Sequence, residues 1–136
     1  MEKMERKRLR LENFDYGANG YYFITICTKD KKKLFSKRVG NGLDRSGAGM
    51  IAEEHLLAIP THFPQVRIDH YVIMPNHIHA IIVIETANVG RSRPSPTLSM
   101  VVGLYKSGVS RAVGYPIWQK SFHDHVIRNE TDYQMI

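Results

Sequence analysis

The stretch VRIDHYVIMPNHIHAIIVI, residues 66–84, decides the fold. Two apolar runs, 66–74 and 77–84, flank the dipeptide PN, which is a strong turn signal. Runs this rich in valine, isoleucine and tyrosine are typical of β-strands. The sequence therefore predicts an antiparallel hairpin whose second strand begins with His77 and continues through His79.

The two histidines raise a question, because burial of an imidazole without partners costs free energy. Side chains alternate between the two faces of a strand, so His77 and His79 should project together while Ile78 projects away. Two imidazoles one pleat repeat apart can chelate a divalent cation. They form an incomplete site, because a catalytic metal usually takes three protein ligands, or two with substrate oxygens. The alternative is that the rings are surface residues on a half-exposed strand.

A second His-x-His triplet, residues 123–125, has less apolar surroundings and ranks below the first as a primary metal site. It could contribute a ligand, contact phosphate or be simply exposed. The single cysteine, Cys27, excludes an intrachain disulfide and favours a reducing compartment. It lies within the β-rich run 21–28, so we interpret it as a buried strand residue rather than a catalytic thiol.

The remaining elements follow from apolar spacing and turn residues. The run 21–28 predicts a first strand, left through the basic turn 29–33, and the four glycines of 39–49 predict a flexible loop. Apolar residues three to four apart predict an amphipathic helix over 48–62, ended by Pro60 or Pro64.

A second helix is predicted over residues 97–113, capped by Thr97 or Ser99. Four of its apolar side chains are expected to face inward: Met100, Val101, Leu104 and Val109. The 136 residues suit one domain, and no window is apolar enough for a transmembrane helix. The charged first ten residues do not form a secretory signal. The net charge of +6 fits a polyanionic partner or simply a basic surface.

Four blocks of the sequence, taken in order, resemble a known family. VIMPNHIHAIIVI resembles the HUH signature of single-tyrosine transposases, in which two histidines flank one hydrophobic residue. GYYFITICTKDKKKLF, TLSMVVGLYKSGVSR and IWQKSFHDHVIRNETDY resemble the first strand, the helix after the HUH strand and the segment before the catalytic helix. The set is most similar to the REP-associated tyrosine transposases, from about Arg8 to Ile136. This resemblance implies a single ferredoxin-like α+β domain over residues 1–136, with an antiparallel sheet of four or five strands covered by helices.

The resemblance also implies a metal-dependent DNA transposase that acts as a single-strand endonuclease and ligase. In such enzymes a tyrosine hydroxyl attacks a phosphodiester, which leaves a 5′-phosphotyrosine link and a 3′-hydroxyl. Mg²⁺ or Mn²⁺ polarises the scissile phosphate, and His77 and His79 carry over as its ligands. The chemistry is coherent, because phosphoryl transfer needs charge neutralisation and in-line positioning more than acid–base power. The phosphotyrosine stores the bond energy for rejoining.

The family's nucleophile has no clear counterpart in the sequence. It sits in a YIxxNP-like motif, absent here, on a helix that we expect to begin at about Glu130. We therefore expect a domain that lacks the end of its catalytic helix, with the nucleophile and a third metal ligand beyond Ile136. Within the chain, Tyr133 lies on the right helix but about two turns early. Tyr105 lies on the earlier helix, where core or groove packing is expected.

The partner implied by the resemblance is DNA, single-stranded or in a hairpin. The candidate phosphate-binding residues are basic side chains of the N-terminal arm, the basic turn and the second helix: Arg6, Arg8, Arg10, Lys31, Lys32, Lys33, Lys106 and Arg111. Each could equally be solvated surface. The family includes dimers that share active sites and proteins that act alone, so a homodimer stays open. We expect a bacterial cytoplasmic protein associated with the nucleoid and with no membrane partner.

Two alternatives to this enzyme remain. One is a catalytically dead remnant of a transposase that still binds a DNA hairpin. The other, more distant, is a small metal-dependent hydrolase that uses the same histidines.

Overall fold

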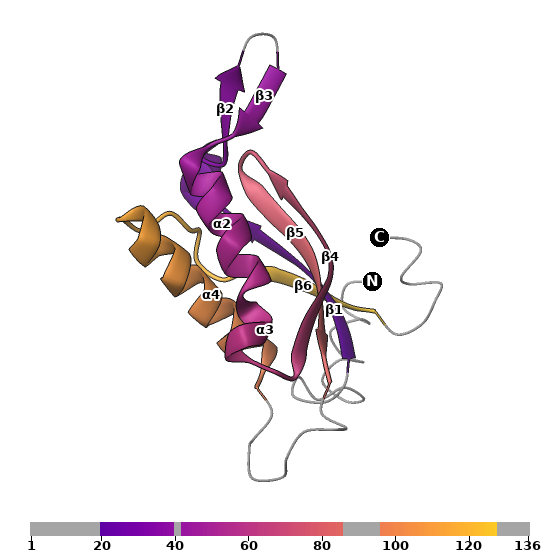
Figure 1. Cartoon of the computed structure of the whole chain (residues 1–136). Helices are drawn as coiled ribbons and strands as arrows, with labels where there is room; N and C mark the ends of the chain where they lie inside the picture. Colours follow the sequence, from indigo (N-terminus) through magenta and orange to yellow (C-terminus); the bar gives the residue numbers. More distant parts are fainter. Residues whose placement is uncertain (1–19, 40–41, 86–95, 128–136) are drawn as a thin grey trace.

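The computed structural model describes residues 20–39, 42–85 and 96–127. The elements are β1 (Gly20–Cys27), the short helix η1 (Lys29–Lys31), β2 (Ser36–Val39), β3 (Gly42–Arg45), α2 (Gly47–Leu57), α3 (Ile59–His62), β4 (Val66–Met74), β5 (His77–Ile84), α4 (Leu98–Val113) and β6 (His123–Ile127). Figure 1 shows their arrangement. Within these ranges no helix is both long and apolar enough to cross a membrane.

The central sheet has four antiparallel strands in the order β4-β5-β1-β6. Along the chain the elements run β1, α2, β4, β5, α4, β6, which is the ferredoxin-like βαββαβ succession. The hairpin β2–β3 is inserted between β1 and α2 and extends past the end of the sheet (Figure 1). The predicted fold class is therefore confirmed, with four strands in the main sheet.

The helices α2, α3 and α4 lie on the same face of the sheet (Figure 1). Alternation along β1 explains this covering, since Tyr22, Ile24 and Ile26 are fully buried in the core while the residues between them are half-buried. Ile78 and Ile82 of β5 belong to the same core. We call the opposite side the open face, because none of the described helices covers it.

The predicted hairpin of residues 66–84 is confirmed residue by residue. The strands pair through Met74↔His77 at the turn, and a register shift interrupts the pairing between Ile68 and His70. Because these strands are rich in β-branched residues and one side of the sheet is buried, a slip of one residue would expose the core. The register therefore fixes on which side each histidine lies.

The predicted flexible loop at 39–49 is wrong. Its first half belongs to the hairpin β2–β3, and its last three residues begin α2. Ser46 closes this segment, because its amide donates to the carbonyl of Phe35 at 3.1 Å and its hydroxyl to that of Leu34 at 2.6 Å. These bonds bring the two ends of the hairpin together, so its described residues, 36–39 and 42–45, form paired strands rather than a loop.

The single helix expected over 48–62 is divided into α2 and α3. Ser46 caps α2 by accepting from the amide of Gly49 at 3.0 Å, and α3 ends at His62, before Pro64. Pro60 does not end the helix. It lies in the first turn of α3, where a missing N–H costs no helical hydrogen bond.

The helix α4 matches its predicted range and is capped by Thr97, whose hydroxyl accepts from the amide of Met100 at 3.1 Å. Its predicted inward face is partly wrong, because Met100 and Leu104 are 52 % and 57 % exposed. The buried stripe consists of Leu98, Val101, Val102, Tyr105 and Val109. This buried stripe has the same three-to-four spacing as the predicted stripe but is rotated around the helix axis. Spacing alone therefore could not show which of the two stripes is buried.

Candidate functional site

His77 and His79 lie together at the start of β5 on the open face. Their ring centres are 4.6 Å apart and their planes are inclined by 74°, while Ile78 between them is fully buried on the helix side. Both histidines are half-buried. The predicted alternation of side chains along this strand is therefore confirmed, and neither ring is buried in the core.

The separation of the two rings suits a shared cation. A divalent ion lies about 2.1 Å from an imidazole nitrogen, so two ligands at a right angle place their ring centres about 4.5 Å apart. The observed distance between the ring centres of His77 and His79 is 4.6 Å. The distance between the ring centres is therefore compatible with two ligands of one ion.

The two rings use the same nitrogen for their protein contacts. Nδ1 of His77 lies 2.7 Å from Oδ1 of Asn76, and Nδ1 of His79 lies 3.0 Å from the hydroxyl of Thr25, its cross-strand neighbour. Neither Nε2 atom has a hydrogen bond to the part of the chain that the structure describes. The Nε2 atoms are therefore the ones that can coordinate a ligand.

The electrostatics keep His79 in the neutral form that a metal ligand requires. Burial, and after it the neighbouring charge of His77, lowers the pKa of His79. The ring of Phe23 stacks on His79 with centres 5.3 Å apart and planes within 18°. A neutral imidazole keeps a lone pair for a cation, which a protonated imidazole does not.

The described residues provide no third ligand of the usual kind. Within 20–39, 42–85 and 96–127 there is no cluster of three His, Cys, Asp or Glu side chains placed to hold a metal. Cys27 is paired with His77 in the strand register, and it is half-buried rather than buried as expected. Two nitrogens alone leave most positions around a divalent ion open to oxygen ligands.

The basic turn lies directly against the turn that precedes His77. The amide of Thr28 donates to the carbonyl of Asn76 at 3.0 Å, and the amide of Phe35 donates to the carbonyl of Pro75 at 3.0 Å. The hydroxyl of Thr28 donates to the carbonyl of Lys32, within the basic turn, at 2.7 Å. The side-chain amide of Asn76 also donates to the carbonyl of Lys31 at 3.3 Å. The fold thus holds the backbone of the basic turn, whose residues Lys31, Lys32 and Lys33 are exposed, against the turn that precedes His77.

The two basic candidates on α4 differ in their surroundings. The ammonium of Lys106 donates to the carbonyls of Gln119 and Ser121 at 2.9 and 2.8 Å, and burial lowers its pKa. Arg111 is exposed and lines, with Tyr115 and other residues, an open hollow of about 670 Å³ at the end of α4. Lys106 therefore fastens the segment before β6 to α4, and a role of either residue in DNA binding stays a prediction.

Among the candidate tyrosines, only Tyr105 can be placed. It is 4 % exposed, its hydroxyl donates to the carbonyl of Ala52 at 2.9 Å, and burial strongly raises its pKa. The expected packing role is thereby confirmed. Tyr133 lies outside the described residues, as do three of the basic candidates: Arg6, Arg8 and Arg10.

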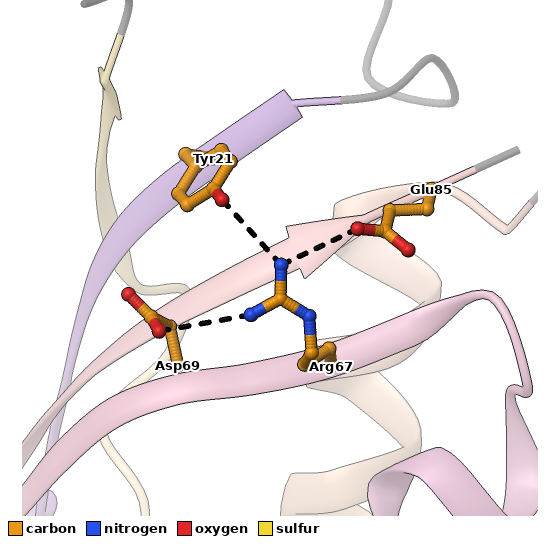
Figure 2. A network of polar contacts seen from close by, with 4 residues as sticks. All are labelled: Tyr21, Arg67, Asp69 and Glu85. Atoms are coloured by element: carbon orange, nitrogen blue, oxygen red, sulfur yellow. Dashed lines mark hydrogen bonds and ion pairs between the residues drawn. The ribbon is translucent and has the colours of Figure 1, made fainter. Parts of the chain in front are cut away.

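A polar network occupies the opposite end of the open face (Figure 2). Nη2 of Arg67 lies 3.4 Å from the hydroxyl of Tyr21 and 3.3 Å from Oε2 of Glu85, while Nη1 lies 3.6 Å from Oδ1 of Asp69. The hydrogen bonds to Tyr21 and Glu85 raise the pKa of Arg67. This network joins β1, β4 and the end of β5, and the sequence analysis did not foresee it.

The sequence analysis also missed three residues that contact the histidine rings: Phe23, Thr25 and Asn76. Asn76 could have been found, because it directly precedes His77 in the turn. Phe23 and Thr25 could be found only once the register of β1 against β5 was known. No local pattern in the sequence contains that register.

Comparison with known proteins supports the resemblance recognised in the sequence. No family model matches the chain. An uncharacterized protein of Haemophilus influenzae is 33 % identical to it over an alignment 150 positions long, which covers 96 % of this chain and 83 % of that protein.

Two solved structures share the fold. A REP-associated tyrosine transposase bound to a REP hairpin aligns with a TM-score of 0.67 at 21 % identity, over 89 % of this chain. The chain spans 64 % of the length of that transposase. A Deinococcus radiodurans protein provisionally assigned as a transposase aligns with a TM-score of 0.52 at 15 % identity, over 86 % of this chain and 85 % of its own. The recognition made from the sequence is confirmed at the level of the fold.

Proposed function

Because the chain belongs to one family with the Haemophilus influenzae protein and has the fold of the REP-associated tyrosine transposases, we propose that it is a DNA-processing enzyme of the transposase type. Its substrate would be single-stranded or hairpin DNA. The observation that carries the proposal is the pair of imidazoles, 4.6 Å apart, with both Nε2 atoms uncommitted to the described residues and a cationic turn beside them.

His77 and His79 would hold Mg²⁺ or Mn²⁺ through their Nε2 atoms. Such an ion, when bound, acts as a Lewis acid that neutralises charge on the scissile phosphate. The lowered pKa of His79 favours coordination, because the neutral ring does not have to lose a proton first. The open face leaves room for phosphate oxygens to complete the coordination.

The basic turn would hold the DNA backbone next to the histidines. Lys31, Lys32 and Lys33 are exposed, and the backbone of their turn is tied to the residue before His77. Cations in this position neutralise phosphates that flank the one being cleaved. The lysines would supply affinity without sequence preference, and the histidine pair would mark the phosphate that reacts.

The cleavage step would use a tyrosine hydroxyl as nucleophile. Its oxygen forms a bond to phosphorus, the bond from phosphorus to the 3′ oxygen breaks, and the hydroxyl proton ends on the released 3′-hydroxyl. Tyr133 is the first tyrosine to test, because Tyr105 is buried with its hydroxyl already donated. The burial of Tyr105 also favours the second candidate, a protein that binds a hairpin without cutting it.

The test is to incubate the chain with labelled single-stranded hairpin DNA and Mn²⁺ and to look for a covalent adduct on a denaturing gel. We expect an adduct that is lost in His77→Ala and in Tyr133→Phe. The matched control is His62→Ala, which removes an exposed histidine from α3, on the other side of the sheet (Figure 1).

The other outcomes separate the alternatives. Binding without any adduct would support the hairpin-binding remnant. Cleavage without an adduct would support a metal-dependent hydrolase. An adduct that persists in His77→Ala would contradict the role of the histidine pair.

A further inference from the structure

The carbonyl of Lys31 determines which way the side chain of Asn76 is turned. A backbone carbonyl can only accept a hydrogen bond, so the atom of Asn76 that lies 3.3 Å from it must be the donor Nδ2. The opposite orientation would place two acceptors against each other. Oδ1 of Asn76 is thereby directed toward the ring of His77, 2.7 Å away.

The orientation of Asn76 in turn determines the tautomer of His77. Oδ1 is an acceptor, so Nδ1 of His77 must carry the proton that joins them. In a neutral imidazole the other nitrogen then has the lone pair. The chain from the carbonyl of Lys31 to the amide of Asn76 and then to His77 thus leaves the lone pair on Nε2.

His79 has no contact that acts in this way. Its Nδ1 lies 3.0 Å from the hydroxyl of Thr25, and a hydroxyl can both donate and accept. Either tautomer of His79 would satisfy this bond. His77 and His79 lie on the same strand and the same face, but their protein contacts set the tautomer of His77 and not that of His79.

We infer that Asn76 is a positioning residue that sets the tautomer of His77 with one end of its amide and holds the backbone of the basic turn with the other. This inference rests on the proposed function, because Nε2 of His77 is the atom that would bind the cation. The backbone carbonyl of Asn76 adds to the link by accepting from the amide of Thr28. The DNA-binding lysines and the metal ligand would therefore move as one unit.

Three proteins test the inference: the wild type and two variants that separate the role of the amide oxygen of Asn76 from that of its amide nitrogen. Asn76→Asp keeps an acceptor for His77 but loses the donor to the carbonyl of Lys31, whereas Asn76→Ala loses both. The measurement is the long-range nitrogen–proton NMR spectrum of the histidine rings in the metal-free full chain, at a pH of about 8, where imidazoles are neutral. Circular dichroism and thermal melting check that each variant folds.

We expect His77 to be protonated on Nδ1 in the wild type and in Asn76→Asp, and to change to Nε2 in Asn76→Ala. The signals of His79 should stay the same in all three proteins. If His77 in Asn76→Ala keeps the wild-type tautomer, the inference is overturned. If one of these variants does not fold, Asn76→Ser takes its place. The serine side chain is shorter, and where it does not reach the ring of His77 we expect the same change of tautomer.

Metal affinity gives the second readout. Loss of a group that orients a ligand typically weakens metal binding by about 10- to 100-fold, and we expect this loss of Mn²⁺ affinity in Asn76→Ala but not in Asn76→Asp. Thr25→Val, with Thr25→Ser as its control, should have a smaller effect through His79. If the tautomers behave as expected but the wild type binds no Mn²⁺, the proposed function fails while the positioning of His77 by Asn76 stands.

Discussion

The two ends of the open face carry polar clusters that differ in how completely their partners satisfy them. At one end, shown in Figure 2, the guanidinium of Arg67 contacts Glu85, Asp69 and Tyr21. At the other end, His77 and His79 each use Nδ1 for a protein contact, and their Nε2 atoms have no hydrogen bond to the described residues. The strand β1 contributes to both clusters, through Tyr21 at the first end and Thr25 at the second.

The electrostatic consequences of the two arrangements are opposite. The hydrogen bonds that Arg67 donates to Tyr21 and Glu85 raise its pKa, so its charge is retained and matched by carboxylates. Burial lowers the pKa of His79, so its charge is disfavoured and a lone pair is kept instead. A satisfied cluster stabilises the sheet, whereas an unsatisfied pair of nitrogens is available to a ligand. This difference, rather than polarity itself, is the reason why we propose the histidine end as the functional one.

The largest effect should come from removing one ligand of the pair. Because a merely orienting group costs up to about 100-fold in metal affinity, His77→Ala and His79→Ala should each weaken Mn²⁺ binding by at least about that factor. Stability should change by less than about 1 kcal/mol, because both rings are half-buried. Isothermal titration calorimetry and thermal melting measure the two quantities.

The control for this experiment is His62→Ala, an exposed histidine of α3 on the helix-covered side of the sheet (Figure 1). It should leave Mn²⁺ affinity unchanged. A variant of His77 or His79 that loses several kcal/mol of stability but keeps its affinity would show that the histidine end is structural, like the arginine end.

The next effect concerns the basic turn. Replacing Lys31, Lys32 and Lys33 by neutral residues should weaken binding of single-stranded DNA by about tenfold or more. It should also lower the salt slope by about two units, since each phosphate contact contributes about 0.7. Lys31 has a φ of 55°, so asparagine is the suitable residue there, with glutamine at Lys32 and Lys33. Fluorescence anisotropy at several salt concentrations measures both quantities. A salt slope equal to that of the wild type would show that DNA does not follow this turn.

Local pattern was sufficient to predict the β4–β5 hairpin and the direction of its histidines. Both follow from the period of two along one strand and from the PN turn, which lie within nineteen consecutive residues, 66–84. The chemistry of the rings could not be predicted in the same way. It depends on Thr25, which is 54 positions away from His79 in sequence and meets it only through the strand pairing.

The errors have the same physical origin. Met100 and Leu104 share their spacing with the stripe that is buried in α4, and only packing against the sheet decides which stripe faces inward. The hairpin β2–β3 was missed because its ends are joined by hydrogen bonds from Ser46 to Phe35 and Leu34. Leu34 precedes Ser46 by 12 positions, so no short sequence pattern contains both partners. Non-local contacts override local propensity in both places.

A third prediction extends the comparison to the helix-covered side of the sheet. Tyr105→Phe removes the hydroxyl that donates to the carbonyl of Ala52, which should cost about 1 kcal/mol of unfolding free energy near neutral pH. The fold raises the pKa of Tyr105, so above a pH of about 10 the folded chain keeps a proton that the unfolded chain loses. The wild type should therefore lose about 1.4 kcal/mol per pH unit through this residue.

The variant lacks this loss, so its deficit in stability should shrink toward zero by a pH of about 11. Urea unfolding at a series of pH values measures the change. Tyr115→Phe is the matched control, because its ring is 52 % exposed. A covalent DNA adduct that disappears in Tyr105→Phe would contradict the structural role of this tyrosine.

The smallest effect is expected at the arginine end. Arg67→Met should lower stability by less than about 1 kcal/mol, and by less still at high salt, because the ion pairs of Arg67 are solvent-exposed. Affinity for DNA should change by less than about twofold, because Arg67 is far from the histidine pair. Arg67 and Val72, the cross-strand neighbour of His79, are five positions apart in β4. This is roughly 16 Å, about twice the screening length in physiological salt. The same anisotropy titration measures it. If Arg67→Met instead weakens DNA binding as much as loss of the lysines does, the nucleic acid follows the whole open face, and the two ends would no longer differ in function.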